Sequence, residues 1–204
     1  MPSDPTRGLA AGTGSRRCHA RGVPSRRWTA VSLLLAVAFL IVLSPGSSAA
    51  QHPSEHQVKA AFLFSLASFV DWPETEQADT LSIGILGQDP FGEAFAPFLD
   101  KQIKDRPVRL HRSTRLQELP PCQVLYICPS EARYLPQILA YLGNRSVLTV
   151  GETEGLAAAG VMINFYLEEN KVRFEINVEA AHRADLKLSA KLLKLARLVE
   201  EDRP

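Results

Sequence analysis

The sequence predicts a single layered α/β domain, in which helices flank a mostly parallel sheet that ends in an antiparallel hairpin and C-terminal helices. Three observations support this fold class. Short apolar runs typical of buried strands alternate with helical segments between residues 58 and 152. Residues 161–176 form two alternating arms around a polar turn. Leucines then recur at helical spacing between residues 188 and 199.

The first 50 residues have the features of a secretory signal peptide. Residues 1–27 contain six arginines and one acidic residue, and an apolar run follows at 31–43. Small residues at Ser48 and Ala50 complete the pattern, so we predict cleavage between Ala50 and Gln51 and release of residues 51–204 into the periplasm. The apolar run is about 13 residues, whereas a membrane span needs roughly 20, which disfavours the alternative of an uncleaved anchor.

Removal of this leader changes the charge of the chain. The whole sequence has 23 basic and 22 acidic residues, of which the leader holds six and one. The remaining 17 basic and 21 acidic residues give a net charge of −4. A mildly acidic chain lacks the basic footprint of a nucleic-acid-binding protein, so we predict no nucleic-acid partner. The 154 residues that remain suffice for one domain with its own core.

The stretch KAAFLFSLASFVDWP, residues 59–73, predicts the first helix. Apolar residues cover most of its circumference, as in a helix that is buried on most sides. Its uncharged run, 60–70, is too short to cross a bilayer. Pro73 disfavours helical geometry at Trp72, so we expect the helix to stop near there. We predict a core helix, and the alternative is a core helix that also lends a face to a partner or a dimer.

The next segments alternate between strands and helices. Asp89 and Pro90 predict the start of a helix, because aspartate caps free amides and proline suits the first turn. Ser130 is the expected cap of a longer helix, which Pro136 should kink or interrupt. The predicted strands are 80–87, 107–113, 123–128 and 146–152, and the predicted helices are 91–101 and 130–143.

The C-terminal part contains the clearest pattern in the chain. Residues 161–167 and 171–176 alternate as two arms of a hairpin around a turn at 168–170. Asn177 predicts the cap of a short helix, and Ser189 predicts the cap of a last helix. The buried stripe of that last helix is expected to comprise Leu188, Leu192, Leu195 and Val199.

Two cysteines remain after the leader is removed, Cys122 and Cys128. They flank the predicted strand CQVLYIC. Six residue steps of about 3.3 Å would place them roughly 20 Å apart, whereas a disulfide needs Cα atoms within about 7 Å. We therefore predict two unpaired thiols and no disulfide.

Patterns for catalysis and metal binding are scarce. The sequence has neither a G-x-S-x-G nucleophile elbow nor a G-x4-G-K-[ST] phosphate loop. His52 and His56 have the spacing of two metal ligands on one helix face, but no third ligand is evident. Glu152 and Glu154 are possible acid and base groups, although carboxylates this close in a loop are usually solvated. We predict no enzyme activity, no cofactor and no metal site.

Five segments carry a resemblance to a known family. They span residues 58–199, and the hairpin with the final helix is the most specific part. The segments are VKAAFLFSLASFVDWP, IGILGQDPFGEAF, CQVLYI, VLTVGETEGLAAAGVMINFYLEENKVRFEIN and RADLKLSAKLLKLARLV. The chain resembles the YfiR family of exported regulators. It departs from the family pattern at Val161, where a second glycine is frequent, and at Asp185, where a glycine commonly separates the last two helices.

The resemblance implies a regulatory role. YfiR-like proteins repress a membrane-bound diguanylate cyclase by engaging its periplasmic sensor region, which lowers cyclic-di-GMP signalling and so bears on biofilm formation. An outer-membrane lipoprotein in turn sequesters them. We therefore predict these two partners for the chain, together with a possible homodimer. The cysteines that form disulfides in some members are absent here, so a disulfide-based redox switch is not expected.

Two kinds of site follow from two hypotheses of function. A regulator that binds a protein partner needs exposed aromatic anchors, and we predict Trp72 and Phe91 as partner-binding residues. The alternative for Trp72 is a place in the core beneath the first strand. The second hypothesis is a small-ligand sensor with a pocket at the carboxyl ends of the parallel strands. Its three loops would be Gly87-Gln88-Asp89, Cys128-Pro129-Ser130 and Gly151-Glu152-Thr153.

Overall fold

The structure is a computed structural model that describes residues 53–73 and 78–202. The predicted cleavage site at Ala50 and Gln51, and His52, lie outside the described residues. The described helices are α2 (Glu55–Ser68), α3 (Leu135–Leu142), α4 (Val178–Arg183) and α5 (Ala190–Leu193), with 3₁₀ helices η2 (Gly92–Phe98), η3 (Leu116–Glu118) and η4 (Pro129–Tyr134).

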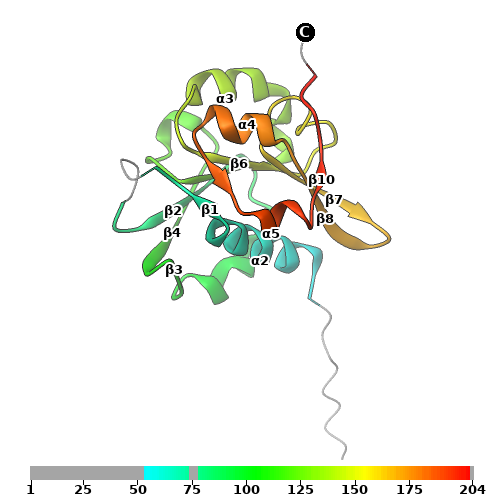
Figure 1. The fold of residues 1–204 in the computed structure, drawn as a ribbon. Helices are drawn as coiled ribbons and strands as arrows, with labels where there is room; N and C mark the ends of the chain where they lie inside the picture. The colour runs from blue at the N-terminus through cyan, green and yellow to red at the C-terminus, as the bar shows by residue number, and fades with distance from the viewer. Residues whose placement is uncertain (1–52, 74–77, 203–204) are drawn as a thin grey trace, which may run out of the picture. The chain divides into compact units, whose positions relative to one another are not determined.

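An eight-stranded sheet forms the centre of the described domain (Figure 1). Its order is β10-β8-β7-β6-β5-β2-β4-β3, and neighbours are parallel except for β7–β8 and β3–β4. A separate antiparallel pair joins β1 (Val70–Asp71) to β9 (Lys187–Leu188). The main strands are β2 (Leu81–Leu86), β4 (Arg106–Ser113), β5 (Val124–Ile127), β6 (Leu148–Gly151), β7 (Ile163–Glu168) and β8 (Lys171–Ile176), with short edge strands β3 (Gln102–Ile103) and β10 (Arg197–Leu198). The predicted fold class is confirmed.

The central strands supply two separate cores, one on each face of the sheet. Along β5, Val124 and Tyr126 belong to the larger core, whereas Leu125 and Ile127 belong to the smaller one. This alternation follows from the two-residue period of a strand. Residues of α2 complete the larger core, and residues of α3 complete the smaller one. Helices therefore flank the sheet on both faces, as the sequence predicted.

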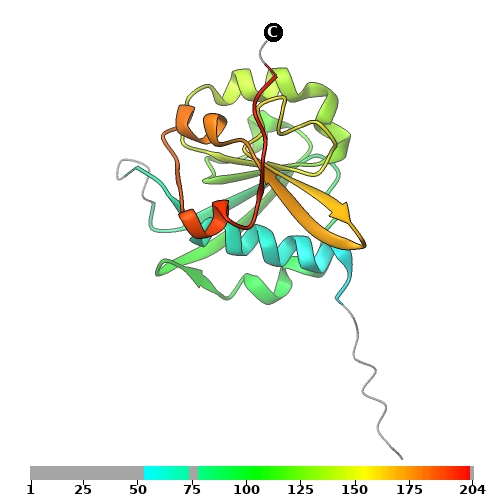
Figure 2. The same ribbon diagram turned by 45° about the vertical axis from the view of Figure 1, so that its right-hand side comes forward.

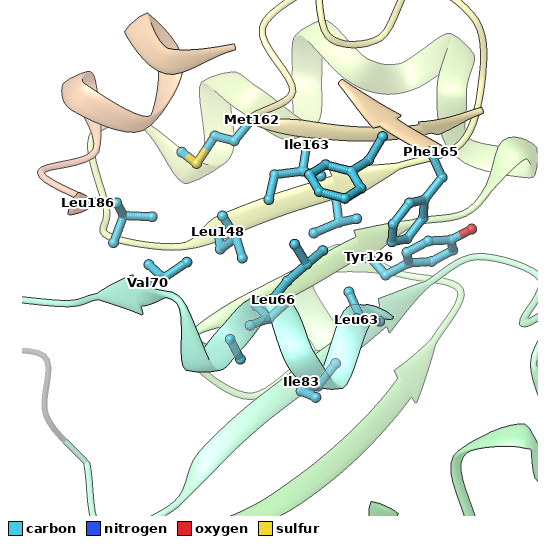
Figure 3. Close-up of a cluster of buried hydrophobic side chains, with 14 of the residues drawn as sticks. Leu63, Leu66, Val70, Ile83, Tyr126, Leu148, Met162, Ile163, Phe165 and Leu186 are labelled. Carbon is cyan, nitrogen blue, oxygen red and sulfur yellow. The ribbon is translucent and has the colours of Figure 1, made fainter. Parts of the chain in front are cut away.

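Helix α2 begins with a capping box. Ser54 Oγ accepts a hydrogen bond from Gln57 N, and Gln57 Oε1 accepts one from Ser54 N. Leu63 and Leu66 face β5 and β7 within the larger core (Figure 3). The helix ends earlier than the predicted position near Trp72, at Ser68, and the chain continues as strand β1. Pairing of β1 with β9 satisfies the backbone that a longer helix would have used.

The predicted helix at 91–101 is also corrected. The structure has a 3₁₀ helix there, η2, which contains Pro97 and ends at Phe98. Proline lacks the N–H of an α-helical hydrogen bond, which favours a short 3₁₀ segment. Asp89 still bonds locally, because its Oδ1 accepts from Phe91 N at 2.7 Å.

Pro136 interrupts the longer helix, as predicted. The segment begins as the 3₁₀ helix η4 and becomes the α-helix α3 at Leu135, so Pro136 lies in the first turn of α3, where it displaces no hydrogen bond. The predicted cap at Ser130 is wrong, since Cys128 occupies the cap position and Ser130 lies inside η4.

The C-terminal hairpin is confirmed. Glu169 and Asn170 have φ of 49° and 59° and form the two-residue turn between β7 and β8, as in a type I′ hairpin. A second hairpin, which joins β3 to β4, was not predicted. Its turn residues Lys104 and Asp105 have φ of 50° and 63° without a glycine to signal them.

The end of the chain departs most from the prediction. Asn177 and Ser189 cap α4 and α5 as expected. Of the predicted stripe, Leu192 is buried and Leu188 packs against the larger core, but α5 ends at Leu193 and Leu195 is 72% exposed, so the prediction is wrong for Leu195. The chain leaves the helix to pair β10 with β8, which directs Leu195 to solvent. Asp185 adopts φ 54°, the backbone state for which a glycine is usual.

Candidate functional site

The loops at the carboxyl ends of β2 and β5 meet, as predicted. Gln88 N donates a hydrogen bond to Ser130 Oγ at 3.0 Å, and Ser130 Oγ donates to Glu131 Oε1 at 3.1 Å. Gly87 has φ 104°, and a Cβ there would lie 2.4 Å from Ser130 Oγ. The close approach of these loops therefore requires a glycine at position 87.

Asp89, in the loop after β2, is bonded to strand β4. Its Oδ2 accepts a hydrogen bond from Arg112 Nε at 2.6 Å, and Arg112 Nη2 also donates to the Gly92 carbonyl at 3.0 Å. Arg112 lies near the carboxyl end of β4. The polar groups of this edge thus hold the loops to one another.

The third predicted loop contributes Glu152, which binds a buried lysine. Lys59 Nζ of α2 forms ion pairs with Glu152 and with Glu55, and the side chains of Lys59 and Glu152 are 7% and 11% exposed. Burial opposes the charge of Lys59, but hydrogen bonds and charge from both carboxylates outweigh it and raise the lysine pKa. The expectation that Glu152 is solvated is therefore wrong, and the lysine joins the start of α2 to the end of β6.

Tyr126 and Cys128 lie beneath this edge in the core. Burial, together with the negative charge of Glu152, raises the pKa of Tyr126. Burial, with the charge of Asp89 next in size, raises the pKa of Cys128 to about 12. Both groups are therefore neutral at physiological pH. Neither is suited to act as a proton acceptor or a nucleophile in this state.

A polar pocket of about 450 Å³ adjoins the Glu152 loop. Asn164 lies at its wall and is fully buried, and its Nδ2 donates to Glu175 Oε1 at 3.1 Å. The carboxylate can only accept, so the amide oxygen Oδ1 faces away from it and has no hydrogen-bond partner among the described residues. The residues lining the pocket are Glu55, Lys59, Glu152, Glu154, Asn164, Phe165, Tyr166, Leu167, Glu175 and Arg197. Of the three predicted loops, only the one with Glu152 contributes to this pocket.

The two predicted anchors are not exposed. Trp72 is 6% exposed and Phe91 is 4% exposed, and both belong to the larger core. Phe91 packs edge-on against Tyr126 and Phe95, with ring centroids 4.7 and 4.9 Å apart. Trp72 lies under the Arg106 guanidinium, 5.8 Å from its ring centroid. The expectation of surface aromatics is therefore wrong, and contact of either residue with a partner stays a prediction.

The two cysteines and the possible metal ligands are the remaining candidate residues. Cys122 and Cys128 are free thiols at the two ends of β5. Within residues 53–73 and 78–202, no group of three or more His, Cys, Asp or Glu side chains is placed to hold a metal ion. Glu55, which lies between the two histidines in the sequence, is engaged by Lys59.

Sequence reasoning missed an apolar groove between α2 and α5. It has a volume of about 320 Å³ and lies on the outer side of α2. Its lining comprises Pro53, Gln57, Val58, Ala61, Phe62, Ser65, Leu66, Phe69, Phe174, Leu192 and Leu195. Figure 2 shows α5 and α2 lying side by side. The nearly all-apolar circumference of α2 was the sequence feature that could have indicated this groove. The groove remains open because α5 ends at Leu193 and covers little of α2.

The fold defines an α/β domain with bonded loops at its carboxyl edge and an open apolar groove. Comparison with known families then identifies it. The family model described as YfiR/HmsC-like matches residues 56–197, and the chain belongs to this family. The family consists of regulatory proteins of the periplasm that act with a membrane-bound diguanylate cyclase.

Several solved structures match the chain, and one of them is similar at low identity. It is described as an ABC domain in complex with L-Trp from Streptococcus pneumonia, and it is 9% identical, with a TM-score of 0.46. The match covers 71% of this chain and 60% of the other, and it carries no conclusion about this chain. Among the residues that the structure describes, no helix has both the length and the apolar character of a membrane span.

Proposed function

We propose that the chain represses a membrane-bound diguanylate cyclase by contact with the cyclase's periplasmic region. The match of the YfiR/HmsC-like model over residues 56–197 carries this proposal. The chain acts in the periplasm after removal of residues 1–50, with cleavage between Ala50 and Gln51. Repression lowers cyclic-di-GMP, and an outer-membrane lipoprotein relieves it by sequestering the regulator.

The arrangement of the domain supports a binding role. The acidic and polar groups of the carboxyl edge are engaged in hydrogen bonds that hold loops together. The groove between α2 and α5 instead offers an open apolar lining. Apolar surface of this kind is typical of sites that contact another molecule.

A repression assay tests this proposal. The chain is expressed in a strain that carries a membrane-bound diguanylate cyclase and lacks its regulator, and cyclic-di-GMP is measured. We expect the full chain to lower cyclic-di-GMP, and a version without residues 1–50 to leave it unchanged because it stays in the cytoplasm. N-terminal sequencing of the exported product should begin at Gln51. Equal cyclic-di-GMP with and without the full chain would rule out repression.

A small-ligand sensor is the second candidate. The unpartnered Asn164 Oδ1 in a polar pocket favours it, since a buried acceptor gains from a donor. The carboxylates of Glu55, Glu152, Glu154 and Glu175 outnumber the cations of Lys59 and Arg197 in this pocket, which suits a cationic ligand. Thermal unfolding with and without putrescine or spermidine is the measurement. A melting temperature that neither amine raises, or that they raise equally in Asn164→Leu, would exclude this class of ligand.

A further inference from the structure

The C-terminal segment 186–199 carries four cations and no acidic residue. One of these cations, Arg197, is already in an ion pair. Arg197 donates to Glu175 Oε2 at 2.5 Å and lies 4.3 Å from the centroid of the Tyr166 ring. Lys187 lies opposite Asp71 in the β1–β9 pair, but the Asp71 carboxylate accepts from Lys104. The other two, Lys191 and Lys194, are exposed and form no ion pair within the described part of the chain.

The same segment carries exposed apolar side chains, and the end of α2, which is joined to it by a hydrogen bond, carries another. Leu195 and Leu198 are 72% and 59% exposed, and Phe69 at the end of α2 is 36% exposed. Phe69 and Leu195 line the same groove, and Ser189 N donates to the Phe69 carbonyl at 2.9 Å. We call Phe69, Lys191, Lys194, Leu195 and Leu198 the α5 face.

The acidic groups around this face do not neutralise its lysines. Asp185 and Glu200 flank the segment in sequence but lie outside it. On the packed elements, Glu55 is held by Lys59 and Glu175 by Arg197, and Asp71 accepts from Lys104. A local positive charge thus remains on a chain whose residues 51–204 are net negative.

We propose that the α5 face binds the surface of a membrane that contains anionic phospholipid headgroups. This inference rests on the proposed function, because the proposed partner is itself membrane-bound. Lys191 and Lys194 contact headgroup phosphates, while Leu195 and Leu198 enter the boundary between headgroups and acyl chains. Exposed leucines beside lysines are the two components of peripheral membrane binding, apolar burial and electrostatic attraction to anionic lipid.

Charge complementarity favours a lipid surface over a protein helix. Lysine is a flexible point charge without the planar geometry of arginine, so it suits mobile phosphates that offer no fixed hydrogen-bond pattern. The remainder of the domain is acidic, which repels the same membrane and gives binding a single orientation. In that orientation the α2–α5 groove lies next to the membrane.

Vesicle flotation of the mature chain, residues 51–204, tests the inference. The probe is vesicles of phosphatidylglycerol and phosphatidylcholine, compared with phosphatidylcholine alone. We expect binding to the anionic vesicles only, weakening as salt is raised because the charges are exposed. At about 1 kcal/mol for each lysine, Lys191→Gln with Lys194→Gln should lower the affinity roughly 30-fold.

A matched pair of variants controls for general loss of charge and apolar surface. Lys194→Gln with Leu195→Ser should reduce vesicle binding by at least about fivefold. Lys101→Gln with Leu99→Ser removes the same groups from exposed positions after η2 and should leave binding unchanged. Melting temperatures of both variants establish that each is folded.

Several outcomes overturn the inference. They are absence of binding to anionic vesicles, equal loss in the two variants, or concentration-dependent dimerisation that the Lys194→Gln, Leu195→Ser variant abolishes while vesicles remain unbound. Loss of cyclase binding by that variant, without vesicle binding by the parent, would make the face a protein interface instead. Failure of the proposed function has a different signature, since the parent would then bind vesicles without lowering cyclic-di-GMP.

Discussion

The carboxyl edge of the sheet and the α5 face differ in how they use their polar groups. At the carboxyl edge, Ser130, Asp89 and Glu152 bond to other parts of the chain. At the α5 face, Lys191 and Lys194 are exposed and Leu195 is in solvent. In α/β folds, the polar groups at this edge usually bind a ligand. Here they form hydrogen bonds and ion pairs between loops and neighbouring elements. The exposed lysines and leucines lie on a short segment that is also anchored in the larger core by Leu186 and Leu192.

The largest expected effect concerns Trp72, for which the sequence left a surface anchor and a core position open and which the structure places in the core. Trp72→Ala should lower the free energy of unfolding by about 3–5 kcal/mol, because it leaves a cavity under β1. Tyr141→Ala removes an exposed ring and should cost less than about 0.5 kcal/mol. Urea unfolding measures both. If Trp72→Ala were as stable as the parent, Trp72 would not be a core residue and would again be a candidate for contact with a partner.

Two leucines of the same groove should respond differently. Leu66 is buried and Leu195 is exposed, although both line the groove between α2 and α5. Leu66→Ala should lower the free energy of unfolding by about 2–5 kcal/mol. Leu195→Ala should change it by less than about 0.5 kcal/mol. Similar losses in the two variants would mean that the α5 face is part of the core and is not free for contact.

A substitution at Gly87 tests how closely the loops after β2 and β5 must approach each other. Gly87→Ala should cost about 2–4 kcal/mol, since it combines a strained backbone with a clash against Ser130 Oγ. Gly92→Ala is the control, because its Cβ would meet nothing within 4 Å, and its φ of 49° should cost only about 1 kcal/mol. Thermal unfolding compares the two. Equal costs would show that the loops can separate without loss.

The smallest expected effect concerns the reactivity of the two cysteine thiols toward alkylation. Burial raises the pKa of Cys122 to about 11 and that of Cys128 to about 12, so neither is a thiolate at pH 8. We expect slow alkylation of both in the native protein and rapid alkylation after unfolding, with no change in stability on reduction. Mass spectrometry reads the modified sites. A linked Cys122–Cys128 peptide would contradict the extended geometry of β5.

Sequence reasoning succeeded where local chemistry decides the structure. Asn177 caps α4 because its side chain can accept from Ala180 N at 2.8 Å, whatever packs around it. The alternation of residues 171–176 likewise identified β8. The convergence of the Gln88 and Ser130 loops followed from parallel strands whose ends share one edge.

Prediction from the sequence failed where contacts between distant segments determine the local structure. Trp72 is buried because β1 pairs with β9, and a pairing of that kind leaves no local pattern. Leu195 has helical spacing from Leu188, yet strand pairing of Arg197 and Leu198 with β8 ends the helix early. The ion pairs of Lys59 also depend on Glu152, which is 93 residues away. Tertiary context outweighed propensity at each of these positions.

The pair β1–β9 also constrains when the domain can fold. Val70 pairs with Leu188, and α2 packs on β5 and β7, so the first helix depends on strands that are synthesised much later. Until those strands leave the ribosome, Leu63 and Leu66 have nothing to cover them. A nascent chain of this kind stays open and exposes an apolar helix that chaperones can hold. Folding is therefore expected to be completed late, once the C-terminal third has emerged, and a chain held open in this way could pass through a narrow pore, as the proposed export would require.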